Sequence, residues 1–559
     1  MFALDIDQIA ELIKSIFPIY LIVALPVFII LSPINPVEAS HEFSAYRMQH
    51  FDLHGTARGS RSSVINLEAR SLTTWSTMRH CVIAQFEDLA LEQLDKLLTQ
   101  AGALLIVLPK DFSRLSAEEK SMILSIEKNM LMQQIYIPVY FMHWSYELKS
   151  IMRDLSTGLT SHEPKKESAA HAMFNSISAN GYQISINAPR PSVKYDLQVV
   201  TLQGKLSGYG VEDKLPTIVL VAHYDSFGIA PELSFGSDSN GSGVVALLEL
   251  ARIFSHFYSN MKTHPRFNML FLLSGGGKIN YQGSKKWLED NIDVAEGSIL
   301  HDVPFVICLD SLAGSSSNEL FFHVSKPPKT GSPGDQFLKI VRNVSENENI
   351  VDMVHKKINL ADDLLAWEHE RFSIKRLPAF TISSLKSHKD YYRSSIFDLK
   401  ENVDTSVLER NVNILAESIA HYVFNFSKSN DIISGSYGVR QDFIKSWVEF
   451  LSAHPRSAQL LGEKNNVLVN LLQETMASYL GDIKVSQMSA DKRDPEFVFY
   501  DVTKAAVHVY NVKPAVFDLF LSAAIGAYLG ICYLTILKFS LLYNAIQSFS
   551  SSVIRKKVN

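Results

Sequence analysis

The sequence predicts a mixed α/β protein with a smaller N-terminal α/β domain, a larger α/β domain and one C-terminal transmembrane helix. Short apolar, strand-like runs alternate with helix-like segments through residues 41–427. Near the C-terminus, Leu519–Leu537 is a run of 19 residues without charge. At 559 residues the chain is too long for a single compact core. These observations together predict the fold class.

Composition excludes several classes of protein. The net charge of −5 is small for this length, and no lysine and arginine stripe is interleaved with aromatic residues, so we expect no nucleic-acid partner. The three cysteines, Cys81, Cys308 and Cys532, exclude a disulfide framework and a paired-cysteine metal site. A single Cys81–Cys308 bridge remains an alternative.

The N-terminus has the pattern of a signal peptide. Residues 16–31 are uncharged and apolar but are interrupted by Pro18 and Pro26, and they are shorter than the about 20 residues that a spanning helix needs. Small or permissive residues at 37–39 follow. We therefore expect residues 1–39 to be a cleaved signal peptide, with an uncleaved signal anchor as the alternative.

The C-terminus has the pattern of a membrane anchor. Leu519–Leu537 lies between Asp518 and Lys538, and as a helix it would span roughly 28 Å, enough for the hydrocarbon core of a bilayer. The tail, 538–559, is basic without acids, which favours a cytosolic tail and a type I topology with the large domains in the lumen.

The last four residues place Lys556 and Lys557 at the fourth and third positions from the end. This arrangement resembles the dilysine retrieval signal of endoplasmic reticulum membrane proteins, which a receptor recognises. We therefore expect the endoplasmic reticulum membrane as the location.

The N-terminal α/β domain is expected over residues 41–160. Apolar runs at 81–86, 103–108 and 135–142 predict strands, and the segments 91–100 and 116–132 predict helices. Ser116 and Glu119 have the spacing of a capping box at the start of the second helix. The polar stretch 161–168 marks a linker.

The larger α/β domain is expected over residues 170–427. Its predicted helix at 242–259 repeats apolar residues at helical spacing. Residues 440–490 are expected to be helical and 491–513 to connect to the membrane, so that 440–513 forms one helical and juxtamembrane region. The predicted strands are 197–203, 217–222, 267–273, 303–309, 319–324 and 379–383.

A distinctive motif lies in residues 217–252, which read TIVLVAHYDSFG, a short loop, and GSDSNGSGVVALLELAR. A strand that ends in His-x-Asp, followed by a Gly/Asp/Ser-rich turn into an apolar helix, resembles the M28-type zinc aminopeptidases. In that family two zinc ions share a bridging carboxylate, and a glutamate activates the bridging water as general base. The resemblance implies an aminopeptidase-like mixed sheet flanked by helices over 170–427.

The resemblance assigns vestigial positions residue by residue. His223 matches the first zinc-ligand histidine, Asp225 the aspartate that orients it, Asp310 a further carboxylate ligand, and His388 the last histidine. Ser239 stands at the bridging aspartate, where a neutral hydroxyl is a poor ligand, while Asp238 is one residue away. Counting back from Gly283 and Ser284, Gly277 replaces the general-base glutamate and Lys278 replaces a ligand glutamate. We therefore predict no enzyme, no bound metal and no cofactor.

Several interpretations of the remaining polar residues stay open. They are hydrogen-bonded residues of an inherited cleft, or His223 and Asp310 bind an adventitious single metal ion. For Lys278 we hypothesise a salt bridge to Asp310 or Asp238, which would place an ammonium where a metal stood, with a solvent-facing lysine as the alternative. The glycines at 275–277 lack the spacing of a phosphate-binding loop.

Three N-x-[ST] sequons lie in the expected lumenal part, at Asn240, Asn343 and Asn425. We expect glycans at Asn240 and Asn425 more than at Asn343.

Further segments extend the resemblance to nearly the whole chain. HEFSAYRMQ, SGGGKINYQGSKKWLEDN, HVSKPP, LAWEHERFSIKRLPAF, ADKRDPEFVFYD and VKPAVFDLF resemble the nicalin family, relatives of nicastrin with a degraded peptidase site. The resemblance implies a complex with nodal modulator and a small multispanning membrane protein. It also implies association with the translocon that inserts multipass proteins, and effects on Nodal signalling and receptor assembly. The alternatives are a peptide-binding pseudopeptidase and a residual aminopeptidase.

Overall fold

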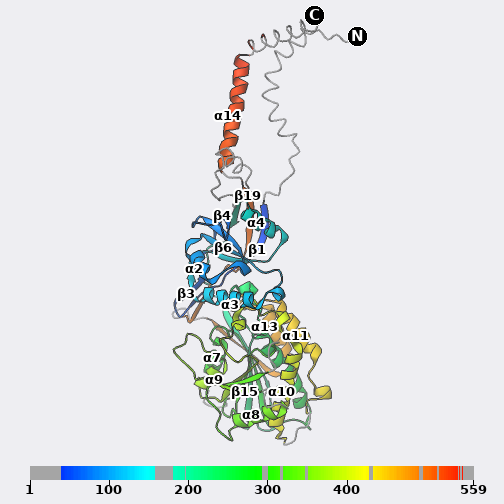
Figure 1. The fold of residues 1–559 in the computed structure, drawn as a ribbon. Helices are drawn as coiled ribbons and strands as arrows, with labels where there is room; N and C mark the ends of the chain where they lie inside the picture. Colours follow the sequence, from blue (N-terminus) through cyan, green and yellow to red (C-terminus); the bar gives the residue numbers. More distant parts are fainter. Residues whose placement is uncertain are drawn as a thin grey trace, which may run out of the picture. The chain divides into compact units, whose positions relative to one another are not determined.

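The computed structural model of the chain describes residues 40–157, 181–195, 197–292, 300–314, 319–345, 351–426, 432–489, 495–512, 515–538, 541 and 544 (Figure 1). The chain divides into two compact units. The first, here called the core unit, consists of Phe43–Lys149 and Ile186–Val507, and the terminal unit contains the remaining residues. The predicted signal peptide, the linker at 161–168 and the lysines at 556 and 557 lie outside the described residues.

The N-terminal part of the core unit is a layer of strands with two helices. Strands β4, β5, β6 and β8 run parallel to one another in this order, and residues 45–47 of β1 pair antiparallel with 140–142 of β8. The elements are β1 (Ser40–Arg47), β2 (His50–Leu53), β3 (Thr56–Ser60), β4 (Ile65–Ser71), β5 (His80–Gln85), α2 (Leu91–Gln100), β6 (Ala103–Val107), α3 (Ala117–Met132), β7 (Gln134–Ile135) and β8 (Val139–Met142).

Local sequence explains why these elements form. β6 is buried along its whole length, as its unbroken apolar run requires for a strand covered on both faces. α3 begins at the predicted capping box, in which the Ser116 hydroxyl accepts from the Glu119 amide and the Glu119 carboxylate accepts from the Ser116 amide. The two predicted helices and the predicted strands at 81–86 and 103–108 are confirmed within one residue, whereas the predicted strand at 135–142 is two short strands, β7 and β8.

The larger part of the core unit is built on a mixed eight-stranded sheet in the order β15-β14-β16-β13-β11-β12-β10-β17. The central strands β12, β11, β13 and β16 are parallel, and β10 is antiparallel to both of its neighbours. The strands are β10 (Gln198–Leu206), β11 (Thr217–His223), β12 (Asn268–Ser274), β13 (Val306–Leu309), β14 (Leu320–Val324), β15 (Val351–His355), β16 (Ala379–Ser383) and β17 (Gly481–Ser489).

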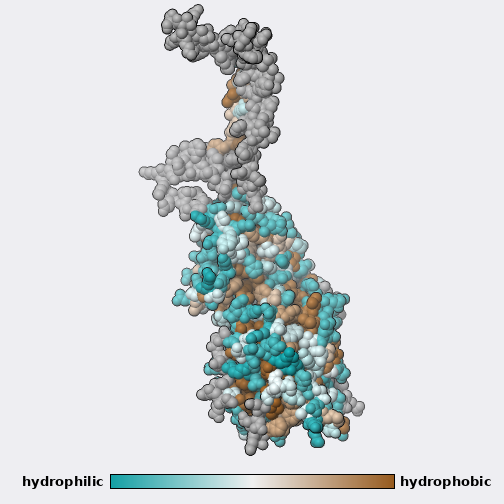
Figure 2. Space-filling view, turned by 90° about the vertical axis from the view of Figure 1, so that its right-hand side faces the viewer, coloured by the Kyte–Doolittle hydropathy of each residue, from teal (hydrophilic) through white to brown (hydrophobic). Residues whose placement is uncertain are grey.

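Helices flank this sheet, as predicted. They are α6 (Gly241–Ser259), α7 (Gln282–Ile292), α8 (Pro333–Val344), α9 (His369–Ile374), α10 (Thr405–Phe424), α11 (Gln441–Ala453), α12 (Ala458–Leu461) and α13 (Val467–Tyr479). α6 is buried on nearly all sides because it packs against the sheet together with α10, α11 and α13. The face seen in Figure 2 mixes hydrophilic and hydrophobic residues over the described body.

The expectation of a helical region over residues 440–490 is wrong at its C-terminal end. The helical region ends at Tyr479, and β17 follows it as an edge strand. The connector contains β18 (Phe497–Phe499) and β19 (Lys504–Val512). β17 is exposed on both faces, so its sequence shows no apolar alternation, and its pairing with β10 joins residues far apart in the chain.

The terminal unit contains a strand pair and the apolar helix. β9 (Gly181–Ile186) pairs antiparallel with β19, Ser185 facing His508. In the described part of the chain, one helix is long and apolar enough to cross a membrane: Leu519–Leu537 within α14 (Ala515–Leu537). The span agrees with the prediction, and its mostly exposed side chains distinguish it from the core helix of a soluble protein. The remaining helix, α4 (Tyr146–Thr157), continues from the core unit into the terminal unit.

Candidate functional site

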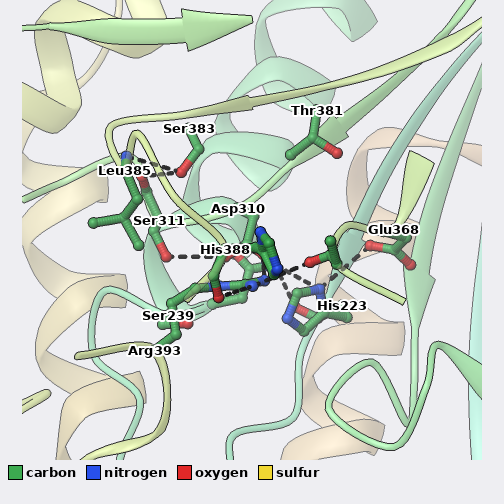
Figure 3. Close-up of polar contacts among 12 residues, drawn as sticks. His223, Ser239, Asp310, Ser311, Glu368, Thr381, Ser383, Leu385, His388 and Arg393 are labelled. Atoms are coloured by element: carbon green, nitrogen blue, oxygen red, sulfur yellow. Dashed lines mark hydrogen bonds and ion pairs between the residues drawn. The ribbon is translucent and has the colours of Figure 1, made fainter. Parts of the chain in front are cut away.

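The predicted site residues come together at the carboxyl ends of the parallel strands. His223 is the last residue of β11, and Asp310 follows directly after β13 (Figure 3). Both side chains are buried, His223 completely and Asp310 to 2% exposure. This edge is where α/β folds place their ligands, so the geometry of each side chain decides what chemistry remains.

His223 is oriented by a carboxylate that the sequence analysis missed. Its Nδ1 atom lies 3.3 Å from Oε2 of Glu368, and the Asn240 amide nitrogen lies 3.4 Å from the same Nδ1. The other oxygen of Glu368 accepts hydrogen bonds from the hydroxyls of Ser274 (2.5 Å) and Ser284 (2.6 Å). Glu368 precedes the short helix α9, within the segment LAWEHERFSIKRLPAF, whose family resemblance assigned it no role at the site.

Asp225 has a different role from the one predicted. Its two carboxylate oxygens accept from the backbone amides of Gly277 (2.6 Å) and Lys278 (2.9 Å). Asp225 therefore fixes the glycine-rich loop, while Glu368 orients His223. The loop amides converge on this carboxylate, so it is hydrogen-bonded without the imidazole.

Gly277 leaves no space for the side chain that a general base needs. A Cβ atom built on Gly277 would overlap the Cβ, Cγ and Cδ2 atoms of His223. The backbone of Gly277 has no positive φ, so the obstacle to a side chain is the neighbouring His223 side chain and not the backbone conformation. A glutamate at position 277 would require His223 to move.

The Lys278 side chain lies among the predicted site residues, but its hydrogen-bond partners are not the aspartates that we hypothesised. Its ammonium donates to the Ser239 hydroxyl (2.6 Å) and to the Arg393 carbonyl (3.1 Å). The predicted salt bridge to Asp310 or Asp238 is wrong, because another cation occupies Asp310. Burial and then the Arg393 cation lower the pKa of Lys278 to about 8, against the raising effect of Asp310.

Asp310 is paired with Arg393, which the sequence analysis missed. Arg393 Nη2 lies 2.5 Å from Asp310 Oδ2, and the Ser311 hydroxyl donates to Oδ1 at 2.9 Å. The guanidinium carbon lies 4.3 Å from the centre of the Trp367 ring. Burial alone would raise the pKa of Asp310, but Arg393, then Lys278 and His223, outweigh it and hold the pKa well below its usual range.

The Asp398 carboxylate fixes the turn that contains Ser239, the predicted bridging position. The Asp398 carboxylate accepts from the backbone amides of Asp238 (2.7 Å) and Ser239 (2.8 Å). Asp238 turns toward the Ser242 hydroxyl (2.6 Å) and the Ala313 amide (2.8 Å). Burial and the neighbouring Asp398 carboxylate raise the pKa of Asp238 to about 7. Asp238 thus bonds to Ser242 and Ala313 and does not take the bridging role that the sequence analysis assigned to position 239.

His388 lies in the loop that supplies Arg393. Its carbonyl accepts from Arg393 Nη1 at 3.2 Å. Burial, followed by Lys356 and Arg393, lowers the pKa of the His388 imidazole to about 4. His388 thus contacts Arg393 through its backbone carbonyl.

The residues present do not fit a pair of zinc ions. Within the described ranges, no three His, Cys, Asp or Glu side chains are grouped so that they could hold a metal. Asp310 is bonded to Arg393, and the hydroxyl of Ser239 to Lys278. The Nε2 atom of His223 is buried without a hydrogen-bond partner among the described atoms. One unpaired ring nitrogen is fewer than the three or four protein ligands of a zinc site.

One predicted glycosylation site is incompatible with the fold. Asn240 is fully buried, and its amide donates to the His223 carbonyl at 2.7 Å, so no glycan fits there. Asn343 and Asn425 are both exposed, at the ends of α8 and α10.

Comparisons with known proteins show the family of the chain. Residues 200–419 match Peptidase family M28. The chain is 44% identical to BOS complex subunit ncln of Danio rerio, over 98% of this chain and 99% of that protein. It is also 44% identical to BOS complex subunit NCLN of Homo sapiens, over 95% and 96%. The chain belongs to the nicalin (NCLN) family.

The fold of this chain is similar to that of nicastrin. The crystal structure of the gamma-secretase component nicastrin matches 84% of this chain and 99% of its own length, with a TM-score of 0.59 and 11% identity. At this identity the match concerns the fold alone. This nicalin-family chain therefore has an M28-type fold, and Lys278 and Arg393 lie among its predicted site residues.

Proposed function

We propose that this chain is a non-enzymatic subunit of an endoplasmic reticulum membrane complex, and that its former peptidase centre has a structural role. One observation carries the proposal: the ammonium of Lys278 and the guanidinium of Arg393 lie among the residues that would bind zinc. Two fixed cations repel a metal dication and neutralise Asp310, the carboxylate ligand that remains. With a serine at 239 and a glycine at 277, neither a bridging ligand nor a general base is present.

The relatives support the role in a complex, since both are named as subunits of the BOS complex. We extend that role to this chain and infer a type I topology with α14 as the anchor, the core unit in the lumen and residues 538–559 in the cytosol. Nodal modulator, a small multispanning membrane protein and the translocon are the proposed partners. Biogenesis of multipass proteins, Nodal signalling and receptor assembly are the proposed processes.

Activity and metal content test the loss of catalysis. Purified full-length protein should hydrolyse no aminoacyl reporter with or without added zinc, and should hold less than one zinc per chain. The His223→Ala variant is the control. Zinc-dependent turnover that this substitution abolishes would contradict the proposal.

Protease protection and glycan mapping test the topology. Protease added to intact microsomes should remove only residues after α14, and endoglycosidase H should shift the mobility of the chain. Asn425→Gln should reduce that shift, whereas Asn240→Gln should leave it unchanged because Asn240 is buried. A tail protected inside the microsomes would reverse the proposed topology.

A further inference from the structure

A strand pair in the terminal unit has one buried face and one exposed face. Residues 508–512 of β19 pair antiparallel with residues 181–185 of β9, and both segments belong to this unit. Neighbouring side chains along a strand point to opposite faces, whereas residues paired across the strands share a face. Val509, its partner Ile184, and Tyr182 are buried on one face. The residues that alternate with them therefore face outward.

The outward face of this described strand pair carries no acidic residue, lysine or arginine. Its residues are Gly181, Gln183, Ser185, His508, Tyr510 and Val512. Tyr510 is 40% exposed and Val512 is 37% exposed. The rings of His508 and Tyr510 stack, with 6.2 Å between their centres. The face thus presents an aromatic ring and an apolar side chain without a fixed charge beside them.

The end of this strand pair is tied closely to the apolar helix. Residues 513 and 514 separate Val512 from Ala515, the first residue of α14. Successive Cα atoms are about 3.8 Å apart, so the Cα atoms of Val512 and Ala515 lie within roughly 11 Å of each other. The uncharged span begins at Leu519, about 6 Å further along the helix. The exposed face therefore ends a short distance before the span.

With α14 across a bilayer, this face lies next to the membrane surface. The hydrocarbon core is about 30 Å thick, and the headgroups add about 5–8 Å on each side. The first turn of α14, residues 515–518, rises about 6 Å and so crosses the headgroup region before Leu519 enters the core. Val512 then lies within roughly 11 Å of the outer boundary of that region. Tyr510 is two strand residues, about 7 Å, from Val512. The headgroups are thus within reach of both side chains.

The chemistry of the face fits the headgroup region. Tyrosine is enriched at membrane–water interfaces, where the ring contacts apolar lipid atoms and the hydroxyl stays hydrated. A face without carboxylates or ammonium groups loses little hydration when it enters this region, whereas a charged face would lose much more. The short link to α14 also keeps the lipid beside this face at a high effective concentration. This tether favours the bilayer over a protein that must first be recruited.

We propose that the exposed face of the β9–β19 pair, through Tyr510 and Val512, contacts the headgroup region of the membrane in which α14 is anchored. The contact orients the terminal unit on the bilayer by side chains as well as by the helix. The inference rests on the part of the proposed function in which α14 is the anchor. A control position within α14 therefore tests the anchor separately.

The test uses purified full-length protein in nanodiscs of phosphatidylcholine. Benzoylphenylalanine, a photo-crosslinking amino acid, replaces one residue at a time, and lipid adducts are measured by mass spectrometry. The test positions are Tyr510 and Val512. Asn511 is the matched control, because it lies between them and its partner Tyr182 belongs to the buried face. Leu529, which is 58% exposed in α14, reports on the anchor.

Lipid adducts at positions 510 and 512 should exceed those at 511 severalfold, and position 529 should crosslink to acyl chains. Lipid adducts at 529, with those at 510 and 512 no higher than at 511, would overturn the inference and leave the anchor intact. A failure to crosslink lipid at 529 would contradict the anchor and the inference with it. In microsomes, an adduct at 510 to a protein or to another segment of this chain, in place of the lipid adduct, would also overturn the inference.

Discussion

Replacing Arg393 by methionine should destabilise the core unit strongly, because it leaves Asp310 buried without its cation. The Arg393 side chain is 10% exposed and that of Asp310 2%, so solvent screens the pair little. Removing one partner of a buried pair costs about 3–5 kcal/mol. Lys278 remains nearby and compensates in part, so we expect about 3 kcal/mol for Arg393→Met at pH 7.

The pH dependence of the destabilisation shows whether it comes from the unpaired charge of Asp310 or from the lost packing of the Arg393 side chain. In the parent, Arg393 holds the pKa of Asp310 below the value of the unfolded chain, so the stabilisation is present above about pH 4 and is lost only in acid. In the variant, burial dominates and raises the pKa of Asp310, so stability falls as pH rises from about 4 towards 7. The difference between parent and variant should therefore increase over this range, by at most about 1.4 kcal/mol per pH unit.

Urea unfolding of the full-length protein between pH 5 and 7.5, followed by tryptophan fluorescence, measures this difference. Arg440→Met is the matched control, since Arg440 pairs with the exposed Asp442 and should change stability by about 0.5 kcal/mol or less. Combining Arg393→Met with Asp310→Asn should recover part of the loss, because no charge remains buried without a partner. A loss below about 1 kcal/mol that is independent of pH would refute the reasoning.

Three further changes test the centre and its surroundings. Gly277→Ala should cost about 1–3 kcal/mol in urea unfolding because its Cβ overlaps His223, whereas Gly334→Ala, whose Cβ meets only ordinary contact, should be nearly neutral; equal effects would contradict the overlap. Lys278→Met should cost less than the arginine change, since burial already lowers the pKa of this lysine to about 8; a larger loss would make the lysine the essential cation. Burial raises the pKa of Glu127 to about 7, so its carboxylate opposes folding increasingly as pH rises from about 4.5 to 7. Glu127→Gln should reduce the fall in the unfolding midpoint between pH 5 and 7.5. If the fall is unchanged, another group causes it.

Local patterns predicted most of the larger sheet and its helices. The unbroken apolar runs of β11 and β12 and the helical spacing of α6 come from covered parallel strands and a buried helix, and these signals are strong in a single sequence. β17 could not be predicted in the same way, because an exposed edge strand needs no apolar face. The division of the chain between 41–160 and 170–427 stays a prediction.

The candidate site was predictable only where motif spacing fixes a position. Counting from Gly283 located Gly277 and Lys278, and the structure places both at the centre. Glu368 and Arg393 were missed because they come from segments about 90 and 115 residues after the glycine-rich loop. Their contacts depend on tertiary folding, and nothing in their local sequence distinguishes them from surface charges.

The segment from Arg393 to Asp398 is attached to three separate elements within six residues. Arg393 bonds Asp310 after β13, the Ser395 hydroxyl donates to Glu127 of α3 at 2.5 Å, and Asp398 holds the turn before α6. Because α3 belongs to the N-terminal layer and the other two contacts to the eight-stranded sheet, neither layer can detach without releasing this segment. Force applied to the core unit would therefore be shared across both layers, and the two layers would resist it as a single mechanical element.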